Sequence, residues 1–501
     1  MSTQALADVN AKSAEARADT GGGRLARNIS LLAGGQFTTW MLTGLWTVVV
    51  PRGIGPAGMG LLVTAWAAAG MMSVVVSLGT RDLLVRRMAV NPSEAPAILG
   101  TAITLRLLLA APGLLLILAY AWLAHFGDEE TAVLLTFSGT TVILLIVEPI
   151  QAAFQAIERM QYLAYTDVLS KAGVTAGGIA LVLFGYGPVA LVRLGISVSA
   201  FALIMNLVWI RRYVRIQFGF RWREIISLLK ASLAYWAFSA FFTLYLWIDS
   251  AMLSVMTTPT VVGWYGVPTK AWGALMFIPV ILATALLPRF SVANEQGLEK
   301  LREVARPFLE LVVVLSLPAA VGLAMVSAPL IRLVWTPIYI PSIPIMVIIA
   351  LSAPATYLSI LLNQVLIARN KPWIWTRVMF GAGVVNIALN LVLIRYFQDR
   401  FGNGAIGAAI SLTVTEIAVA GVGIALFKGF LTLGSLWRLL RAAAATAVMA
   451  GIIWVTASRG PVIEIAAGAA TFAVAAWLFR LATPDDVQAL RALLPWERRR
   501  A

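Results

Sequence analysis

Four cationic side chains of this sequence lie inside long apolar stretches, where a charge is costly to bury. They are Arg106, Lys171, Arg193 and Lys270. A charge at the centre of a membrane costs at least ~2.5–3.5 kcal/mol, so such residues usually face a cavity or pair with another charge. A pyrophosphate group brings about two negative charges and needs fixed cations where water is scarce. All four are therefore candidate ligands for a phosphorylated substrate, although Arg193 lies close enough to the outer surface to extend to water instead.

Acidic side chains lie in the same apolar stretches and could form ion pairs with these cations. The pairs expected from depth and spacing are Arg106 with Glu148, Lys171 with Asp167, and Lys270 with Asp249. Asp167 precedes Lys171 by four residues, a spacing at which two side chains meet on one helix. Two alternatives stay open: the pairs only hold helices together, or they leave enough positive charge to bind a substrate.

Glu416 has no basic neighbour in its own apolar stretch and lies near the middle of it. An unpaired carboxylate there would be protonated part of the time, which suits coupling to a proton or a sodium ion. A protonated glutamate that hydrogen-bonds a neighbouring helix is an equally good interpretation. The chain has no cysteine and one histidine, so we expect neither a thiolate nor a histidine metal centre and no other cofactor.

The composition shows what kind of elements must hold these residues. Of the 501 residues, 60% are hydrophobic and 12% are charged, whereas a soluble domain has about 25% charged residues. We therefore expect an all-α integral membrane protein. The excess of basic residues gives a net charge of +15, which in a membrane protein faces anionic lipid, so a nucleic acid partner is not expected.

Fourteen apolar segments are long enough to cross ~30 Å of hydrocarbon as helices. They span residues 29–50, 58–79, 97–124, 131–155, 163–184, 188–210, 230–255, 262–288, 307–328, 345–367, 373–396, 404–427, 439–457 and 461–481. The segment 345–367 is the least regular, because Pro341, Pro344 and Pro354 interrupt it or lie beside it.

The distribution of lysine and arginine supports an even number of spans with both termini in the cytoplasm. With the N-terminus inside, 29 of the 38 basic residues fall on the inner side, five fall outside and four lie within spans. Positive charge marks the cytoplasmic side of membrane proteins. The sequence thus predicts a multi-pass protein of the plasma membrane, the inner membrane of a bacterium.

The chain also repeats with a period of about six spans. Pro56-x3-Gly60 recurs as Pro259-x3-Gly263, and Phe184-Gly-Tyr-Gly187 recurs as Phe401-Gly-Asn-Gly404. Repeats of an even number of spans keep their orientation and are related by an axis along the membrane normal. We expect two parallel six-helix lobes around a central cavity, followed by two further helices.

Three blocks of sequence resemble the polysaccharide (lipid-linked oligosaccharide) flippases of the multidrug/oligosaccharidyl-lipid/polysaccharide exporter superfamily. They are residues 51–60 (PRGIGPAGMG), residues 262–270 (VGWYGVPTK) continuing to 285–290 (ALLPRF), and residues 386–394 (NIALNLVLI) continuing to 404–409 (GAIGAA). The resemblance implies alternating access of two lobes around a cavity that accepts a polyprenyl-pyrophosphate-linked oligosaccharide. It also implies a transporter that is not an enzyme, that contacts membrane lipids and polysaccharide-assembly proteins, and that works as a monomer.

The predicted domain organisation follows from these spans. It comprises a disordered cytoplasmic tail (1–28), a six-helix lobe (29–210), a cytoplasmic linker (211–229), a second six-helix lobe (230–428), two further helices (429–483) and a basic amphipathic tail (484–501). Tryptophans near span ends, among them Trp122, Trp335, Trp373 and Trp437, are expected to anchor the helices at the membrane surface.

Other functions remain open on the residues alone. A multidrug or other lipid exporter of the same superfamily would share the fold, although four intramembrane cations favour an anionic lipid head over a cationic drug. A membrane glycosyltransferase would need acidic catalytic residues on a sizeable external loop, and the external loop at 330–344 carries no carboxylate. A membrane scaffold would have no need of so many intramembrane charges.

Overall fold

The computed structural model describes residues 3–219, 222–430, 432–457 and 459–481, with side chains described for most positions from residue 34 on. The predicted tail 484–501 lies outside these residues, and the side chains of the predicted tail 1–28 lie outside the described ones. Every regular element of the described part is a helix. The expected all-α membrane architecture is confirmed.

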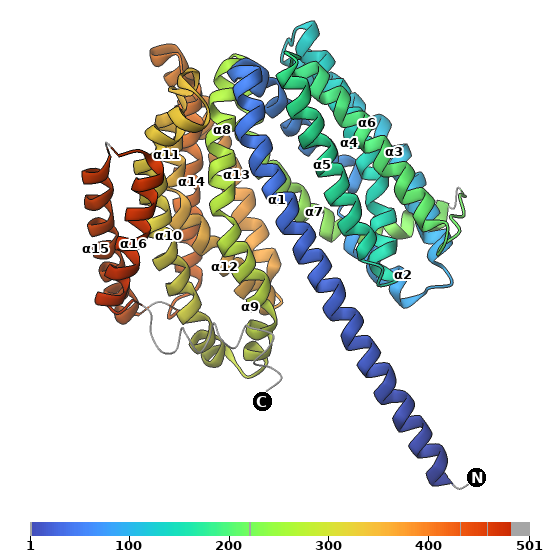
Figure 1. Ribbon diagram of the computed structural model, residues 1–501. Helices are drawn as coiled ribbons and strands as arrows, with labels where there is room; N and C mark the ends of the chain where they lie inside the picture. The colour runs from blue at the N-terminus through green and yellow to red at the C-terminus, as the bar shows by residue number, and fades with distance from the viewer. Residues whose placement is uncertain (1–2, 220–221, 431, 458, 482–501) are drawn as a thin grey trace. The chain divides into compact units, whose positions relative to one another are not determined.

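The helices form two units, each described by itself. The first unit comprises residues 1–53 and 68–240, and the second comprises residues 54–67 and 241–501. Helix α7 (Trp222–Met256) contributes to both units, and so does α1 (Thr3–Ser77). The other helices of the first unit are α2 (Arg81–Val90), α3 (Ala95–Leu123), α4 (Asp128–Ala156), α5 (Gln161–Leu183) and α6 (Pro188–Ile210) (Figure 1).

The second unit contains most of the chain's C-terminal half. Its helices are α8 (Pro259–Leu275), α9 (Phe277–Glu295), α10 (Leu298–Val334), η1 (Pro337–Tyr339), α11 (Ser342–Ala350), α12 (Ala353–Ala368), α13 (Pro372–Phe401), α14 (Gly404–Leu426), α15 (Leu433–Thr456) and α16 (Pro461–Leu478).

Helix α1 is broken at Gly55, inside the predicted external loop. Gly55 has φ 68° and ψ 179°, a conformation that costs little only for glycine. Pro56 follows and lacks the backbone N–H that a continuous helix would use. The break divides α1 into two arms, and residues 54–67 of the second arm, hereafter the 54–67 segment, belong to the second unit.

Twelve helical stretches of the described residues are long and apolar enough to cross a membrane, or up to thirteen with the bent pair α11 and α12. Residues 34–90 are counted among the twelve as a single stretch of 57 residues. A helix of 57 residues is more than twice as long as the ~30 Å thickness of the hydrocarbon core. The chain is a multi-pass membrane protein, and the number of fourteen spans stays a prediction.

The proline-rich segment after α10 is interrupted as its composition predicts. The short helix η1 follows α10, and α11 and α12 then meet at a bend of 44°. Pro341 lies directly before α11 and Pro354 lies in the first turn of α12, positions where proline is tolerated because no helical N–H is lost. The resulting bend places α12 against α10, α9 and α14.

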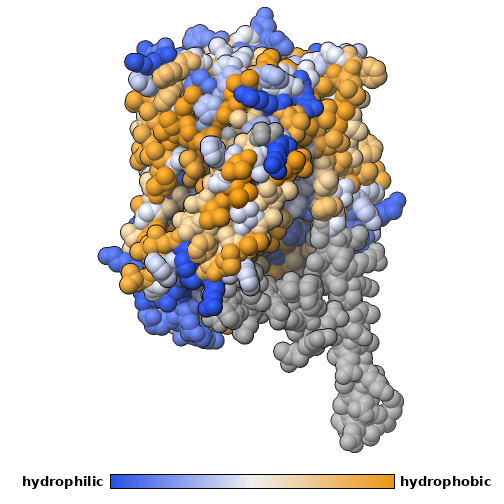
Figure 2. All heavy atoms as spheres, turned by 60° about the vertical axis from the view of Figure 1, so that its left-hand side comes forward, coloured by the Kyte–Doolittle hydropathy of each residue, from blue (hydrophilic) through white to orange (hydrophobic). Residues whose placement is uncertain are grey.

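Each unit has its own apolar core. In the first unit Leu99, Ile150 and Phe154 are fully buried among α2, α3 and α4. In the second unit Phe290 and Tyr357 are fully buried among α9, α10 and α12. Many large apolar side chains nevertheless stay exposed, and Figure 2 shows them across the middle of the face it turns forward, with hydrophilic side chains gathered toward the ends. This distribution is that of a surface solvated by lipid.

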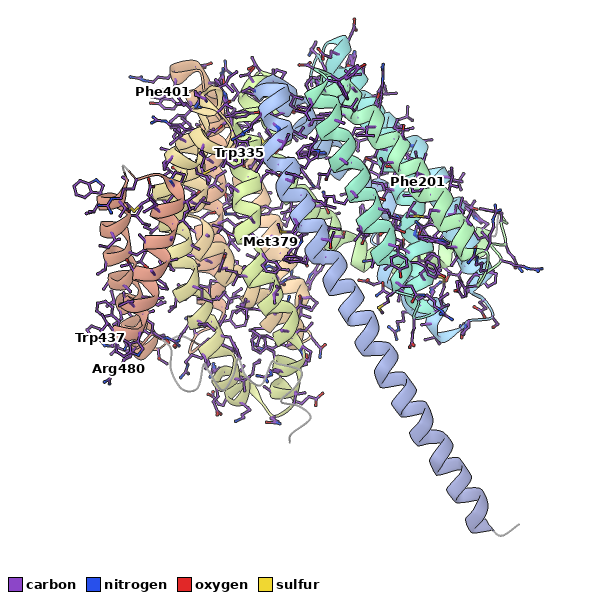
Figure 3. All side chains as sticks on the ribbon, in the orientation of Figure 1. Phe201, Trp335, Met379, Phe401, Trp437 and Arg480 are labelled. Atoms are coloured by element: carbon purple, nitrogen blue, oxygen red, sulfur yellow. The ribbon has the colours of Figure 1, made fainter. Side chains whose placement is uncertain are left out.

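The last two helices are fastened to α10 by a buried ion pair. Arg438 on α15 lies 3.0 Å from the Glu310 carboxylate on α10, and its guanidinium also donates to the Leu481 carbonyl after α16 at 2.8 Å. Figure 1 shows α15 and α16 as a pair beside α10. In Figure 3, Trp437 and Arg480 lie at the same end of this pair.

The predicted tryptophan anchors are partly corrected. Trp122, Trp373 and Trp437 are exposed at 77%, 55% and 64% of their surface, as side chains at a membrane surface would be. Trp335 is 4% exposed and packs with Tyr339 in a small apolar cluster after α10. The chain turns back through η1 at this point and covers Trp335, which a linear pattern of spans does not reveal.

Candidate functional site

Asp249 on α7 is buried in the second unit and is held by neutral groups. Its side chain accepts a hydrogen bond from the Asn390 amide at 2.6 Å and another from the Tyr265 hydroxyl at 3.1 Å. The same Asn390 amide nitrogen donates to the Asn386 carbonyl oxygen at 2.9 Å. Helices α7, α8 and α13 therefore meet at one carboxylate, which is 5% exposed.

Glu416 on α14 lies in the same region and is also 5% exposed. The Tyr245 hydroxyl donates to its carboxylate at 2.6 Å. Tyr245 precedes Asp249 by one helical turn on α7, so the two acids approach the same stretch of that helix. The charge of Asp249 acts electrostatically on Glu416. We call Tyr245, Asp249, Asn386, Asn390 and Glu416 the acid network.

The acid network contains one oxygen that lacks a partner. The Asn390 side-chain oxygen is buried and accepts no hydrogen bond from any group that the structure describes. No ion pair between described residues includes Asp249 or Glu416. Buried carboxylates surrounded by neutral amides and hydroxyls, with an amide oxygen left over, can accept a proton or a small hard cation.

Arg106 is hydrogen-bonded to three different groups of its own unit. In the first unit its guanidinium donates to the Val76 carbonyl at 2.6 Å, to the Thr80 hydroxyl at 2.9 Å and to the Glu148 carboxylate at 2.9 Å. Arg106 is 2% exposed. The ion pair expected from depth is formed, and it joins α3 to α4 and to the turn between α1 and α2.

The expected pair on α5 is arranged differently. No ion pair between described residues joins Lys171 to Asp167. The Asp167 side chain instead hydrogen-bonds Gln151 on α4 and lies within electrostatic reach of Arg81. Asp167 is exposed and Lys171 is half-buried. Asp167 therefore bonds the Gln151 amide of the neighbouring helix and not Lys171, which lies four residues further along its own helix. Arg193 on α6 is exposed.

Lys270 on α8 lies over an aromatic ring of the 54–67 segment. Its ammonium nitrogen is 3.9 Å from the ring centroid of Trp66, within the ~6 Å at which a cation is attracted to an indole face. Both residues belong to the second unit. The predicted ion pair between Lys270 and Asp249 is not formed between these described residues. Asp249 instead accepts hydrogen bonds from Tyr265 and Asn390, so similar depth did not identify its partners.

Sequence reasoning overlooked Trp66. Its signal is its place: Trp66 lies well inside an apolar span, whereas the predicted anchors lie near span ends. The contact with Lys270 depends on close packing of two repeated motifs. A β-carbon on Gly60 would lie 1.7 Å from the Pro259 carbonyl oxygen, and one on Gly263 would lie 1.9 Å from the Pro56 carbonyl oxygen. Only glycine permits two helix backbones to approach so closely.

The helical architecture and the long apolar helices define a multi-pass membrane protein. The family described as "Polysaccharide biosynthesis protein" matches residues 25–293, more than half of the chain. The chain belongs to this family.

Individual relatives are distant. The chain is 21% identical over 373 residues to the "Probable low-salt glycan biosynthesis flippase Agl15" of Haloferax volcanii, covering 73% of this chain and 75% of the relative. The fold is similar to that of the lipid II flippase MurJ in an inward closed conformation, with a TM-score of 0.73, 15% identity, and coverage of 90% of this chain and 98% of MurJ. It is also similar to an inward-facing multidrug resistance transporter of the MATE family, with a TM-score of 0.64, 15% identity, and coverage of 80% and 94%.

Proposed function

We propose that this protein flips a polyprenyl-pyrophosphate-linked oligosaccharide from the cytoplasmic to the outer leaflet by alternating access. Membership of the polysaccharide biosynthesis family is the observation that carries this proposal. The Haloferax relative, described as a probable flippase of glycan biosynthesis, supports it over the greater part of both chains. The substrate is a precursor of a cell-surface polysaccharide.

The cations within the helices suit the head group of such a substrate. Lys270 presents a primary ammonium beside the Trp66 indole, and sugars and phosphates are recognised by such pairs of an aromatic face and a donor of positive charge. Lys171 and Arg193 supply two further cations in the first unit. Arg106 is committed to Glu148, Val76 and Thr80, so we assign it a positioning role rather than direct contact with phosphate.

The acid network is the proposed site of energy coupling. Asp249 and Glu416 are both buried, lie within electrostatic reach of each other and are hydrogen-bonded by neutral groups. Binding of a proton or a sodium ion would neutralise part of their charge. The unpartnered Asn390 oxygen is a further candidate ligand for a cation. Release of that ion would then favour a different packing of α7 against α13 and α14.

The multidrug exporter is the second candidate, because two buried carboxylates could also bind a cationic drug. A single reconstitution separates the two functions. Purified protein in proteoliposomes is supplied with a fluorescent polyprenyl-pyrophosphate oligosaccharide, or with a lipophilic cationic dye, under a proton gradient or a sodium gradient. Flipping of the glycan lipid under one gradient supports the proposal. Dye export without glycan flipping would replace it with the drug exporter.

A further inference from the structure

A cluster of tyrosines and arginines lies at one end of the first unit and is not used by the proposed transport. Tyr162 and Trp209 face each other at 5.0 Å between ring centroids, and Tyr213 lies 5.9 Å from Tyr162. Tyr165 completes the group at 6.3 Å from Trp209. These residues come from the start of α5, the end of α6 and the turn after α6, at the ends that the distribution of basic residues predicts on the cytoplasmic side.

Two hydroxyl groups of this cluster are adjacent and accessible. The Tyr162 and Tyr213 hydroxyl oxygens are 3.0 Å apart and exposed. One of the two protons is used between them, which leaves one phenolic O–H to donate outward. Tyr165 and Tyr213 are 46% and 41% exposed. An aromatic group that buries its rings and leaves its hydroxyls exposed suits the boundary between hydrocarbon and water.

Arginines surround these hydroxyls. The Arg159 guanidinium carbon lies 5.1 Å from the Tyr213 ring centroid, and the charges of Arg159 and Arg212 both act on Tyr162. Arg211 and Arg215 are exposed beside them. No ion pair between described residues includes any of these four arginines. The cluster therefore presents concentrated positive charge together with a hydroxyl donor.

We infer that this cluster is a binding site for an anionic glycerophospholipid of the inner leaflet, whose phosphodiester lies at the Tyr162 and Tyr213 hydroxyls between Arg159 and Arg212. Arginine donates to phosphate oxygens in a bidentate manner, and the phenolic O–H adds a third donor. The exposed ring of Tyr165, with the half-buried Trp209 beside it, lies where the glycerol and upper acyl chain of such a lipid would pass. This site is independent of the transported substrate.

The test measures lipid binding by the full-length protein in detergent. Native mass spectrometry counts the phosphatidylglycerol and phosphatidylcholine molecules retained at increasing lipid concentration. The wild type is expected to retain phosphatidylglycerol preferentially. Arg159→Gln with Arg212→Gln should weaken that binding roughly thirtyfold, since each arginine near an anionic surface contributes about a fivefold effect. Tyr162→Phe with Tyr213→Phe, which keeps both rings and removes both hydroxyls, should weaken it by about fivefold.

The matched control is Arg395→Gln with Arg400→Gln, which removes the same charge from exposed positions on α13. Unchanged phosphatidylglycerol binding by this control, together with loss in the cluster variants, supports the site. Equal retention of the two lipids by the wild type would overturn it, and so would full retention by both cluster variants. Displacement of the lipid by millimolar inorganic phosphate, or at least tenfold tighter binding of a polyprenyl pyrophosphate, would assign the site to another ligand and also overturn it. Both cluster variants are first checked for a wild-type melting temperature, so that a folding defect is recognised separately. If the arginine variant fails this check, Tyr162→Phe with Tyr213→Phe decides the outcome.

Discussion

Gly60 and Pro259 touch through their backbones: a β-carbon placed on Gly60 would lie 1.7 Å from the Pro259 carbonyl oxygen. The equivalent residues of the two repeats make the reciprocal contact, with Gly263 against Pro56. A pair of contacts in which each motif uses the same residues is what a pseudo-two-fold axis produces. The repeat found in the sequence is therefore also a packing relationship in the second unit.

Replacing Gly60 by alanine is expected to lower stability, because the carbonyl that the new methyl group meets belongs to the backbone and cannot rotate away. Overpacking of this kind costs on the order of 1–3 kcal/mol. The melting temperature of the purified protein measures the effect, with Gly383→Ala on α13 as the control, since its β-carbon would meet nothing within 4 Å. A Gly60→Ala protein that melts with the wild type would show that the two backbones separate easily.

Arg106 is expected to act mainly through stability. Arg106→Ala leaves Glu148 without its cation and the Val76 carbonyl without its donor, and breaking a buried ion pair costs about 3–5 kcal/mol. Arg106→Lys should recover only part of this loss, because a lysine cannot reproduce three directed bonds. Thermal stability and flipping per folded molecule are measured together. Normal stability combined with abolished flipping in Arg106→Lys would instead indicate direct contact with substrate.

Glu416→Gln should reduce transport while leaving the amount of folded protein near normal. The amide has the shape of the carboxylate and can still accept a hydrogen bond from Tyr245, so packing is preserved while the titrating group is lost. Transport is measured against proton and sodium gradients in proteoliposomes, with Glu303→Gln, an exposed surface change, as the control. Ion-dependent transport at the wild-type rate in Glu416→Gln would remove Glu416 from the coupling site.

Lys270→Ala should abolish flipping. The contacts to be lost include the cation over the Trp66 ring, which by itself is worth about 0.5–2 kcal/mol. Asp249 keeps its bonds to Asn390 and Tyr265 in this variant. The double variant Lys270→Ala with Asp249→Asn should therefore not regain activity. Trp66→Phe should retain more flipping than Trp66→Ala because it keeps an aromatic face. If the double variant recovers both stability and flipping, Lys270 serves only to balance Asp249.

The fourteen-span topology can be checked directly because the chain contains no cysteine. Single cysteines at exposed positions on the predicted inner side should react with an impermeant thiol reagent only after the membrane is opened; these positions are Arg86, Gln296 and Leu436. Cysteines at Glu129, Arg400 and Arg459 should react in intact cells. Protection of the cysteine at Arg459 in intact cells would show that one of the last spans is absent.

Much of the helical pattern was predictable from hydropathy and proline. The span predicted at 188–210 coincides with α6, and that at 404–427 ends one residue beyond α14. Hydropathy could not show that α1 continues on both sides of Gly55 or that the 54–67 segment belongs to the second unit. These features depend on contacts between residues about two hundred positions apart, and such contacts leave no local signal.

The pairing of the charged residues within the apolar helices was only partly predictable, and their role in a site stays a prediction. Arg106 and Glu148 pair as their similar depth suggested. Equal depth did not identify the partners of Asp249, because depth says nothing about the direction in which a side chain leaves its helix. Asn386 and Asn390 follow one another by four residues on α13, so the Asn390 amide can donate both to the Asp249 carboxylate and to the Asn386 side-chain oxygen.

The 54–67 segment has a consequence for the way the protein is made. Gly60 leaves the ribosome 199 residues before Pro259, its packing partner, and at 5–20 residues per second this interval is roughly 10–40 s. During that time the segment is already in the membrane while the α8 surface that it will contact has not been synthesised. The second unit therefore cannot complete its packing until α8 is synthesised and meets the 54–67 segment, and a ribosome stalled before residue 259 would leave Gly60 without its packing partner.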